Sequence, residues 1–215
     1  GTLRDAPYGT GTHATTPHAG DEGRPATGWH AEFGDVDNDG RLDLFIAKGN
    51  VDQMPSNAIR DPNNLLMQQA DGTFAEASVA AGVATMERAR GAALADLDGD
   101  GRLDLVVVNR RAPMELWQNA TPATGNWLAL SLRMDGPNTR AVGAWVELRS
   151  EAGVQTREVT VGGGHAGGQA GPLHFGLGLA EEAEVRVLWP GRGWSDWTAI
   201  EANRRVVLHP EGATP

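Results

Sequence analysis

The sequence predicts an all-β protein in which two β-propeller-blade-like repeats are followed by a β-sandwich-like domain. An acidic segment between two apolar runs occurs twice, and its copies begin 61 residues apart, at Asp35 and Asp96. Helical periodicity is poor along the 215 residues, while short alternating or β-rich stretches are frequent. The chain also contains 29 glycines, which indicates many turns between short strands.

The two copies have the same internal order. In each copy an apolar run leads into an acidic loop and a second apolar run follows, an order that is typical of strand, turn and strand. The spacing of the copies is of the size expected for one propeller blade with an insertion. The loops are residues 35–43 and 96–104, and the flanking runs are residues 28–34, 45–47, 90–95 and 106–108.

Further β-rich stretches complete the repeats and form a second domain. The composition changes at residues 121–125, which we interpret as a linker. We therefore divide the chain into an irregular N-terminal arm (1–27), two repeats that form an incomplete propeller (28–122) and a β domain of ordinary size (123–215). The other predicted strands are residues 64–68, 73–77, 114–119, 127–133, 142–148, 155–161, 185–189, 197–200 and 205–208.

Each acidic loop predicts a site for one calcium ion. Aspartates at positions 1, 3 and 5 of a tight loop direct hard oxygen ligands toward one point. Glycine at position 6 permits the turn, and a backbone carbonyl at position 7 and an aspartate at position 9 complete the shell. An EF-hand would need an acidic residue at position 12, where Ile46 and Val107 stand. The predicted ligands of the two Ca²⁺ ions are Asp35, Asp37, Asp39, the carbonyl of Arg41 and Asp43, and Asp96, Asp98, Asp100, the carbonyl of Arg102 and Asp104.

The overall charge and composition exclude several classes of function. The net charge of −10 disfavours nucleic acid as a partner, because phosphate binding needs a basic face. The absence of cysteine excludes disulfides and thiolate metal sites. We expect no transmembrane segment, since no apolar run approaches about 18 residues. The opening residues do not read as a signal peptide, so we expect a mature or processed form.

The loops and their flanking strands resemble the FG-GAP/VCBS repeats of calcium-binding β-propellers. The part after Asn126 resembles the ASPIC/UnbV domain, and the order of the two is that of the cartilage-acidic-protein-like family. The resemblance implies an exported protein, extracellular or periplasmic, that binds calcium and serves adhesion or interaction. It carries no catalytic residues over to this chain, so we expect a non-enzymatic protein. The motifs that carry the second resemblance are residues 126–128, 141–146, 157–159, 162–165, Gln169, 174–178 and 187–191.

The small number of repeats leads to expectations about partners. A closed propeller needs at least four blades, whereas this chain has two calcium units. Exposed sheet edges promote aggregation, so we expect a protein partner or the N-terminal arm to cover them. One alternative function is an accessory structural subunit of a larger, possibly membrane-associated, complex.

A second alternative is a carbohydrate-binding module. Trp194 and Trp197 lie in one loop and could stack on a glycan or anchor a partner, or they could instead cap the sandwich. His165, Gln169 and His174 surround a glycine-rich stretch, which is either a ligand pocket or a set of turns. His13 and His18 could form a zinc pair, but no further ligands support it. The tryptophans expected in the core are Trp29, Trp117, Trp127, Trp145 and Trp189.

Overall fold

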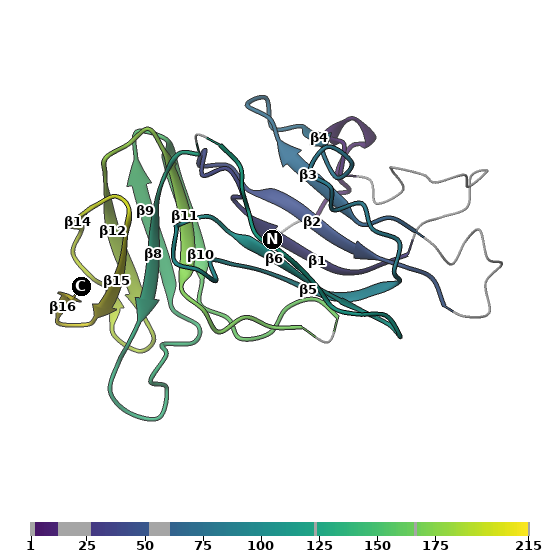
Figure 1. The fold of residues 1–215 in the computed structure, drawn as a ribbon. Coiled ribbons are helices and arrows are strands. Elements are labelled where there is room, and N and C mark those ends of the chain that lie inside the picture. Colours follow the sequence, from purple (N-terminus) through teal and green to yellow (C-terminus); the bar gives the residue numbers. More distant parts are fainter. Residues whose placement is uncertain (1–2, 13–26, 52–60, 123, 166, 215) are drawn as a thin grey trace.

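The computed structural model describes residues 3–12, 27–51, 61–122, 124–165 and 167–214 (Figure 1). Strands dominate it, and the one helical element among the described residues is a 3-10 turn, η1 (Tyr8–Thr10). The prediction of an all-β protein is therefore confirmed. Most of the predicted N-terminal arm, including His13 and His18, lies outside the described residues.

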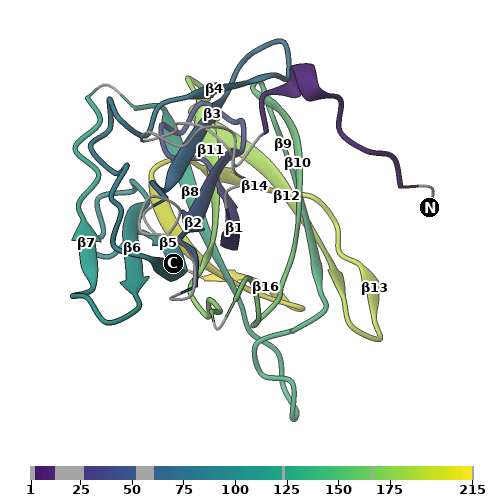
Figure 2. The same cartoon turned by 90° about the vertical axis from the view of Figure 1, so that its right-hand side faces the viewer.

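The two repeats form two antiparallel sheets. The first sheet contains β1 (Gly28–Gly34), β2 (Asp43–Lys48), β3 (Asn64–Gln68) and β4 (Phe74–Glu76), in that order. The second contains β5 (Ala89–Ala95), β6 (Asp104–Asn109) and β7 (Glu115–Trp117), and Figure 2 shows β7 at the outer edge. The first two strands of each sheet are joined by an acidic loop, as the sequence predicted, and the described strands do not close into a propeller.

The two repeat sheets pack through unlike faces. On the first sheet, Phe45 and Ala47 are fully buried in the shared core, and on the second sheet Leu105 and Val107 lie in that core. By the repeat alignment Phe45 corresponds to Val106, which points to the opposite side of the second sheet. The residues that the first sheet buries in the shared core therefore have their equivalents on the outer face of the second sheet.

The C-terminal half is a sandwich of two sheets. One sheet runs β10 (Gly153–Glu158), β9 (Trp145–Ser150), β12 (Glu182–Trp189) and β13 (Gly193–Trp194), with β14 (Thr198–Glu201) also paired to β12. The other runs β11 (Leu173–Gly178), β8 (Asn126–Leu132), β15 (Arg204–His209) and β16 (Gly212–Thr214), and β8 and β15 are parallel. Alternate apolar residues from both sheets fill the core, among them Leu128, Leu130, Val146, Leu148, Phe175, Val185, Val187 and Val206.

The expectation for the tryptophans holds only in part. Trp189 is buried, whereas Trp145 is 41% exposed, so its assignment to the core was wrong. The reason is the alternation along β9, which points Val146 and Leu148 inward and therefore turns Trp145 outward.

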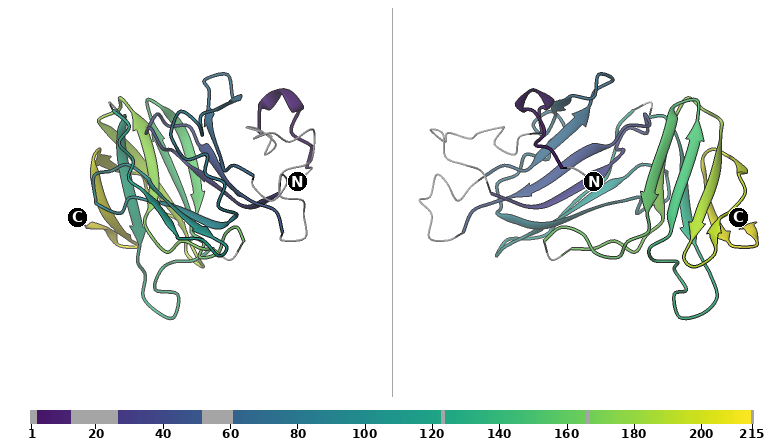
Figure 3. Two further views of the ribbon diagram at one scale, coloured as in Figure 1. Left: turned by 45° about the vertical axis from the view of Figure 1, so that its right-hand side comes forward. Right: turned by 180° about the vertical axis from the view of Figure 1, so that it is seen from behind.

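The outer face of the β11–β8–β15–β16 sheet faces the acidic loops. The strand register places His174, Ala129 and Arg205 in one row across β11, β8 and β15. Seen from both sides, the sandwich stands at one end of the molecule and the repeat sheets extend away from it (Figures 1 and 3). Their junction is where the loops lie, because the row of sheet residues bonds directly to them.

Candidate metal centre

The two acidic loops adopt the same turn. Positions 4 and 6 have positive φ in both loops: 60° at Asn38 and 91° at Gly40 in the first, 88° at Gly99 and 85° at Gly101 in the second. Glycine and, less readily, asparagine tolerate this conformation. The sequence difference at position 4, Asn against Gly, is therefore compatible with one shared backbone path.

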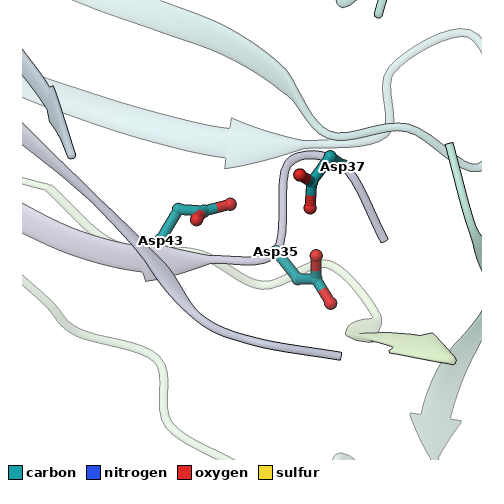
Figure 4. Close-up of side chains that lie close together, drawn as sticks. All are labelled: Asp35, Asp37 and Asp43. Carbon is teal, nitrogen blue, oxygen red and sulfur yellow. The ribbon is translucent and has the colours of Figure 1, made fainter. Parts of the chain in front are cut away.

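The first loop gathers three carboxylates in a nearly closed space. Ligand atoms of Asp35, Asp37 and Asp43 all lie within 4.8 Å of one another, and their carboxylates converge in Figure 4. Asp35 is 1% exposed and Asp43 is 2% exposed. Backbone N–H groups hold both: Asp35 accepts from Gly40 at 2.8 Å, and Asp43 accepts from Val36 at 3.0 Å.

The electrostatics of the first loop favour a bound cation. Burial, with added repulsion from the neighbouring aspartates, raises the pKa of Asp35 to about 7. Burial likewise raises the pKa of Asp43 to about 6 and raises that of Asp39. Ionising such a cluster at neutral pH is unfavourable unless a positive charge enters it.

One oxygen of the first loop lacks the partner that a cation would provide. Asp37 Oδ1 is buried and has no hydrogen-bond partner, an arrangement that costs free energy. The hard oxygens of Asp35, Asp37 and Asp43 are the donors that Ca²⁺ prefers, so the residues fit this ion. The predicted ligand Asp39 lies outside this trio, and its carboxylate forms an ion pair with Arg41.

The second loop is similar in sequence but more open. Asp96, Asp98 and Asp100 have ligand atoms within 4.8 Å of one another, and Asp98 and Asp100 are exposed. The predicted ligand Asp104 lies outside this group, and its carboxylate accepts from the N–H groups of Leu97 at 3.0 Å and Asn119 at 2.9 Å.

A basic side chain from the C-terminal half reaches into the second loop. Arg205 forms an ion pair with Asp96 at 2.8 Å. Burial acts to raise the pKa of Asp96, but the hydrogen bond from Arg205 and the N–H groups of Gly99 and Gly101 outweigh it, and the pKa lies below its ordinary value. The second loop is therefore partly neutralised by the protein itself.

Asn38 is a functional residue that the motif did not identify. Its amide donates to the carbonyl of Gly101 at 2.9 Å, and its side-chain oxygen lies 2.7 Å from His174 Nε2. Its own carbonyl accepts from the N–H of Gly178 at 2.8 Å. Asn38 thus joins both loops to β11. In the sequence, the only indication of this role was that position 4 is asparagine in the first loop and glycine in the second.

Two close approaches complete the junction between loops and sheet. A side chain at Gly101 would collide with the ring of Trp127, and one at Gly176 would collide with the carboxylate of Asp35. The side chain of Asn119 also bridges the loops by donating to the carbonyls of Val36 at 2.8 Å and Leu103 at 3.1 Å. The candidate metal sites therefore form one part of the contact between the two halves of the chain.

The residues around the glycine-rich stretch make separate contacts, and two of them, Gln169 and His174, line one cavity together. Gln169 donates to the carbonyl of Leu94 at 2.7 Å and also bonds to Glu32. The His165 ring lies 4.9 Å from that of Trp29, while His174 bonds to Asn38. The stretch thus contacts β1 and β5, and both interpretations of it, turns and a ligand pocket, stay predictions.

Trp194 and Trp197 stack with arginine side chains on the outer face of the sandwich. The guanidinium carbon of Arg186 lies 4.4 Å from the centroid of Trp194 and 4.6 Å from that of Trp197, and that of Arg149 lies 4.1 Å from Trp197. These cation–π contacts stabilise the sheet surface and leave less ring face for a sugar.

Within the described part of the chain, no helix is long and apolar enough to cross a membrane.

Comparisons with known proteins agree with this architecture. Residues 134–215 match the model of the ASPIC and UnbV family, and residues 53–107 match that of an FG-GAP-like repeat. Cartilage acidic protein 1 of Mus musculus is 29% identical over 188 residues, which cover 82% of this chain and 28% of that protein. The Homo sapiens protein is 29% identical over 164 residues, covering 73% and 24%.

The chain therefore spans about a quarter of the length of the curated relatives it matches. The matches confirm the resemblance that the sequence indicated. The chain carries an FG-GAP-like repeat followed by an ASPIC and UnbV domain, and it is related in sequence to cartilage acidic protein 1.

Proposed function

We propose that this chain is a calcium-stabilised interaction module that binds two calcium ions and acts by binding rather than by catalysis. The observation that carries the proposal is the cluster in the first loop. There the buried Asp35 and Asp43 lie close to a buried oxygen of Asp37 that has no hydrogen-bond partner. Such a cluster is costly with neither protons nor a metal ion in it.

Three aspartates in each loop would hold the ion, namely Asp35, Asp37 and Asp43, and Asp96, Asp98 and Asp100. The ion supplies positive charge that cancels their mutual repulsion. Asp39, Asp104 and the carbonyls of Arg41 and Arg102 stay in the proposed ligand sets, although in this arrangement both acids have other partners. Because both loops also bond to the C-terminal sheet, ion binding would stabilise the junction between the halves.

The proposed place of action is outside the cytoplasm, in an extracellular or periplasmic space. Loops of this kind bind calcium with affinities that suit extracellular concentrations. The sequence similarity to cartilage acidic protein 1 also supports a place of action outside the cytoplasm.

The outer face of the second repeat sheet supports a protein partner. Ala93, Val106 and Leu116 form one apolar row across β5, β6 and β7, and Val108 lies beside it on β6. Leu116 is 61% exposed and Val108 is 50% exposed. The first repeat sheet buries the equivalent face against a second sheet, so we propose that the partner presents a sheet with large apolar residues. This surface also suits the alternative role as a subunit of a larger complex.

The partner proposal is tested by affinity capture from the extracellular fraction of the source cells. We expect Leu116→Lys to abolish capture of the partner that the wild-type chain retains. Val154→Lys is the matched control, because Val154 is 67% exposed on β10, in a different sheet. Equal capture by all three proteins would place the interaction elsewhere.

Calcium binding is tested by calorimetric titration of the calcium-stripped chain, with melting followed in parallel. We expect two sites and a higher melting temperature, with Asp37→Asn removing one site and Asp98→Asn removing the other. Asp135→Asn, outside the loops, should retain both. Absence of binding heat and of any calcium-dependent melting shift would refute the proposal.

A further inference from the structure

The two loops differ in one charge that is supplied from outside the repeats. Arg205 Nη2 lies 2.8 Å from Asp96 Oδ2 and 3.3 Å from the carbonyl oxygen of Asp96. The Asp96 side chain is 7% exposed, whereas that of Arg205 is 49% exposed. The guanidinium group thus closes the first ligand position of the second loop from the solvent side.

The first loop has no equivalent cation on its first ligand position. Asp35 accepts hydrogen bonds from the backbone of Asp39 and Gly40, and among the described residues it forms no ion pair. Arg157 on β10 is close enough to sense the charge of Asp35, but its own hydrogen bonds go to Thr156 and Gln155. The C-terminal sheet contacts this loop through neutral groups, the backbone of Gly176 and Gly178 and the ring of His174.

The ion pairs at positions 5 and 7 and the N–H contacts at position 9 are shared by both loops and cannot distinguish them. At position 7 an arginine pairs with the aspartate at position 5 in each loop, as Arg41 with Asp39 and Arg102 with Asp100. At position 9, Asp43 and Asp104 each accept two backbone N–H groups. Arg205 is therefore the ion-pair partner that sets the second loop apart.

A fixed cation beside a ligand lowers the affinity of that site for a second cation, because the two positive charges repel each other. The coupling is reciprocal: whatever Arg205 does to calcium affinity, bound calcium does to the contact made by Arg205. Since Arg205 belongs to β15, that contact is also a contact between the two halves of the chain.

We propose that Arg205 sets the calcium affinity of the second loop by competing with the ion for Asp96, so that the first loop fills at lower calcium concentration than the second. Filling the second loop weakens the hold of β15 on it. This inference rests on the proposed calcium binding, and the first loop serves as its internal reference.

The test is calorimetric titration of the full, calcium-stripped chain with CaCl₂. The wild type should show a tight and a weak site, and Asp98→Asn should remove the weak one. Arg205→Gln keeps hydrogen-bond donors but loses the charge, and we expect it to tighten the weak site about two- to fivefold, the size of a half-exposed ion pair. This gain should shrink at about 1 M salt, where charges are screened within about 3 Å.

Two further variants exclude a folding artefact. Arg205→Lys keeps the charge and should retain the wild-type affinity of the weak site. Arg149→Gln removes an arginine of the same half that pairs with Glu184 and not with a loop carboxylate, and it should also change nothing. The inference is overturned if both sites bind but Arg205→Gln leaves the weak site unchanged or weaker. Binding at neither site in any variant would instead overturn the proposed function itself.

Discussion

At the scale of single residues, the buried acids of the first loop link stability to pH. The pKa of Asp35 is raised to about 7 and that of Asp43 to about 6 in the metal-free fold, both mainly by burial. A carboxyl group with a raised folded pKa favours folding when protonated, and this contribution is lost as pH rises. The relevant window runs from the ordinary aspartate pKa, about 4, to about 7.

We therefore expect the calcium-free chain to be less stable at about pH 7.5 than at about pH 5. With saturating calcium the order should reverse, because the ligands must be ionised and protons compete with the ion. Urea unfolding at several pH values, with and without calcium, measures both trends. Asp35→Asn should flatten much of the calcium-free dependence, and parallel trends in the two conditions would contradict the account.

A second residue-scale prediction concerns a buried ion pair in the first repeat sheet. The side chain of Lys48 is fully buried, and its Nζ lies 3.1 Å from Asp61 Oδ1. Burial lowers the pKa of Lys48, opposed by the charges of Asp61 and Glu76. Asp61→Asn removes the paired carboxylate and should lower the free energy of unfolding by about 3–5 kcal/mol.

Denaturant unfolding with calcium present measures this change without involving the loops. Glu184→Gln is the control, since it breaks an ion pair with Arg149 in which both side chains are nearly half exposed. That substitution should cost no more than about 1 kcal/mol. A similar cost for the two variants would mean that burial does not govern the Lys48 pair.

At the scale of elements, the loop turns are fixed by backbone conformation and by what lies against them. Gly101 and Gly143 both have φ of 85°. A Cβ at Gly101 would meet the Trp127 ring on β8, whereas a Cβ at Gly143 has nothing within 4 Å. Substituting each glycine by alanine therefore separates the free-energy cost of a side chain at positive φ from the cost of the clash with Trp127.

We expect Gly143→Ala to cost about 1 kcal/mol, the penalty for a side chain at positive φ. Gly101→Ala should cost at least about 2 kcal/mol more, because the ring or the loop has to move. Thermal and urea unfolding give both values. Equal losses would show that the loop and β8 are not in close contact in solution.

Alternation of apolar residues located several of the long strands. β8, β12 and β15 lie close to the predicted ranges, because apolar residues that face one core recur at every second position along them. β11, β13 and β16 were not among the predicted strands, and β11 is interrupted by the glycines Gly176 and Gly178. The strand predicted from Val142 begins only at Trp145, because a turn at positive φ occupies Gly143.

At the scale of the whole molecule, the acidic loops contribute to the contact between the two halves. Asn38 bonds to Gly101 in the other loop, and to His174 and Gly178 on β11. Its φ of 60° is one that glycine adopts freely, as Gly99 does in the second loop. Asn38→Gly thus removes the bridging side chain without straining the turn.

We expect Asn38→Gly to lower stability by about 2–3 kcal/mol, because buried polar partners are left unpaired. Hydrogen exchange should rise at β8 and β11 and in both loops together. Asn203→Gly is the matched control: Asn203 has φ of 61° and is exposed, and its amide bonds to Asn126 within the C-terminal half. Loss of protection confined to the first loop would show that the halves are held by other contacts.

The sequence by itself determined the strand content, the two loops and the identity of their aspartates. Those features depend on local rules: alternation for strands, positive φ for Gly40 and Gly101, and oxygen donors at fixed spacing for calcium. Only the tertiary structure decided that Asp35 is buried next to Gly176 of β11. It also decided that Arg205, 109 residues away, neutralises Asp96. The burial of Asp35 and the ion pair of Asp96 depend on which distant strands fold against each loop, and local sequence patterns do not encode those long-range contacts.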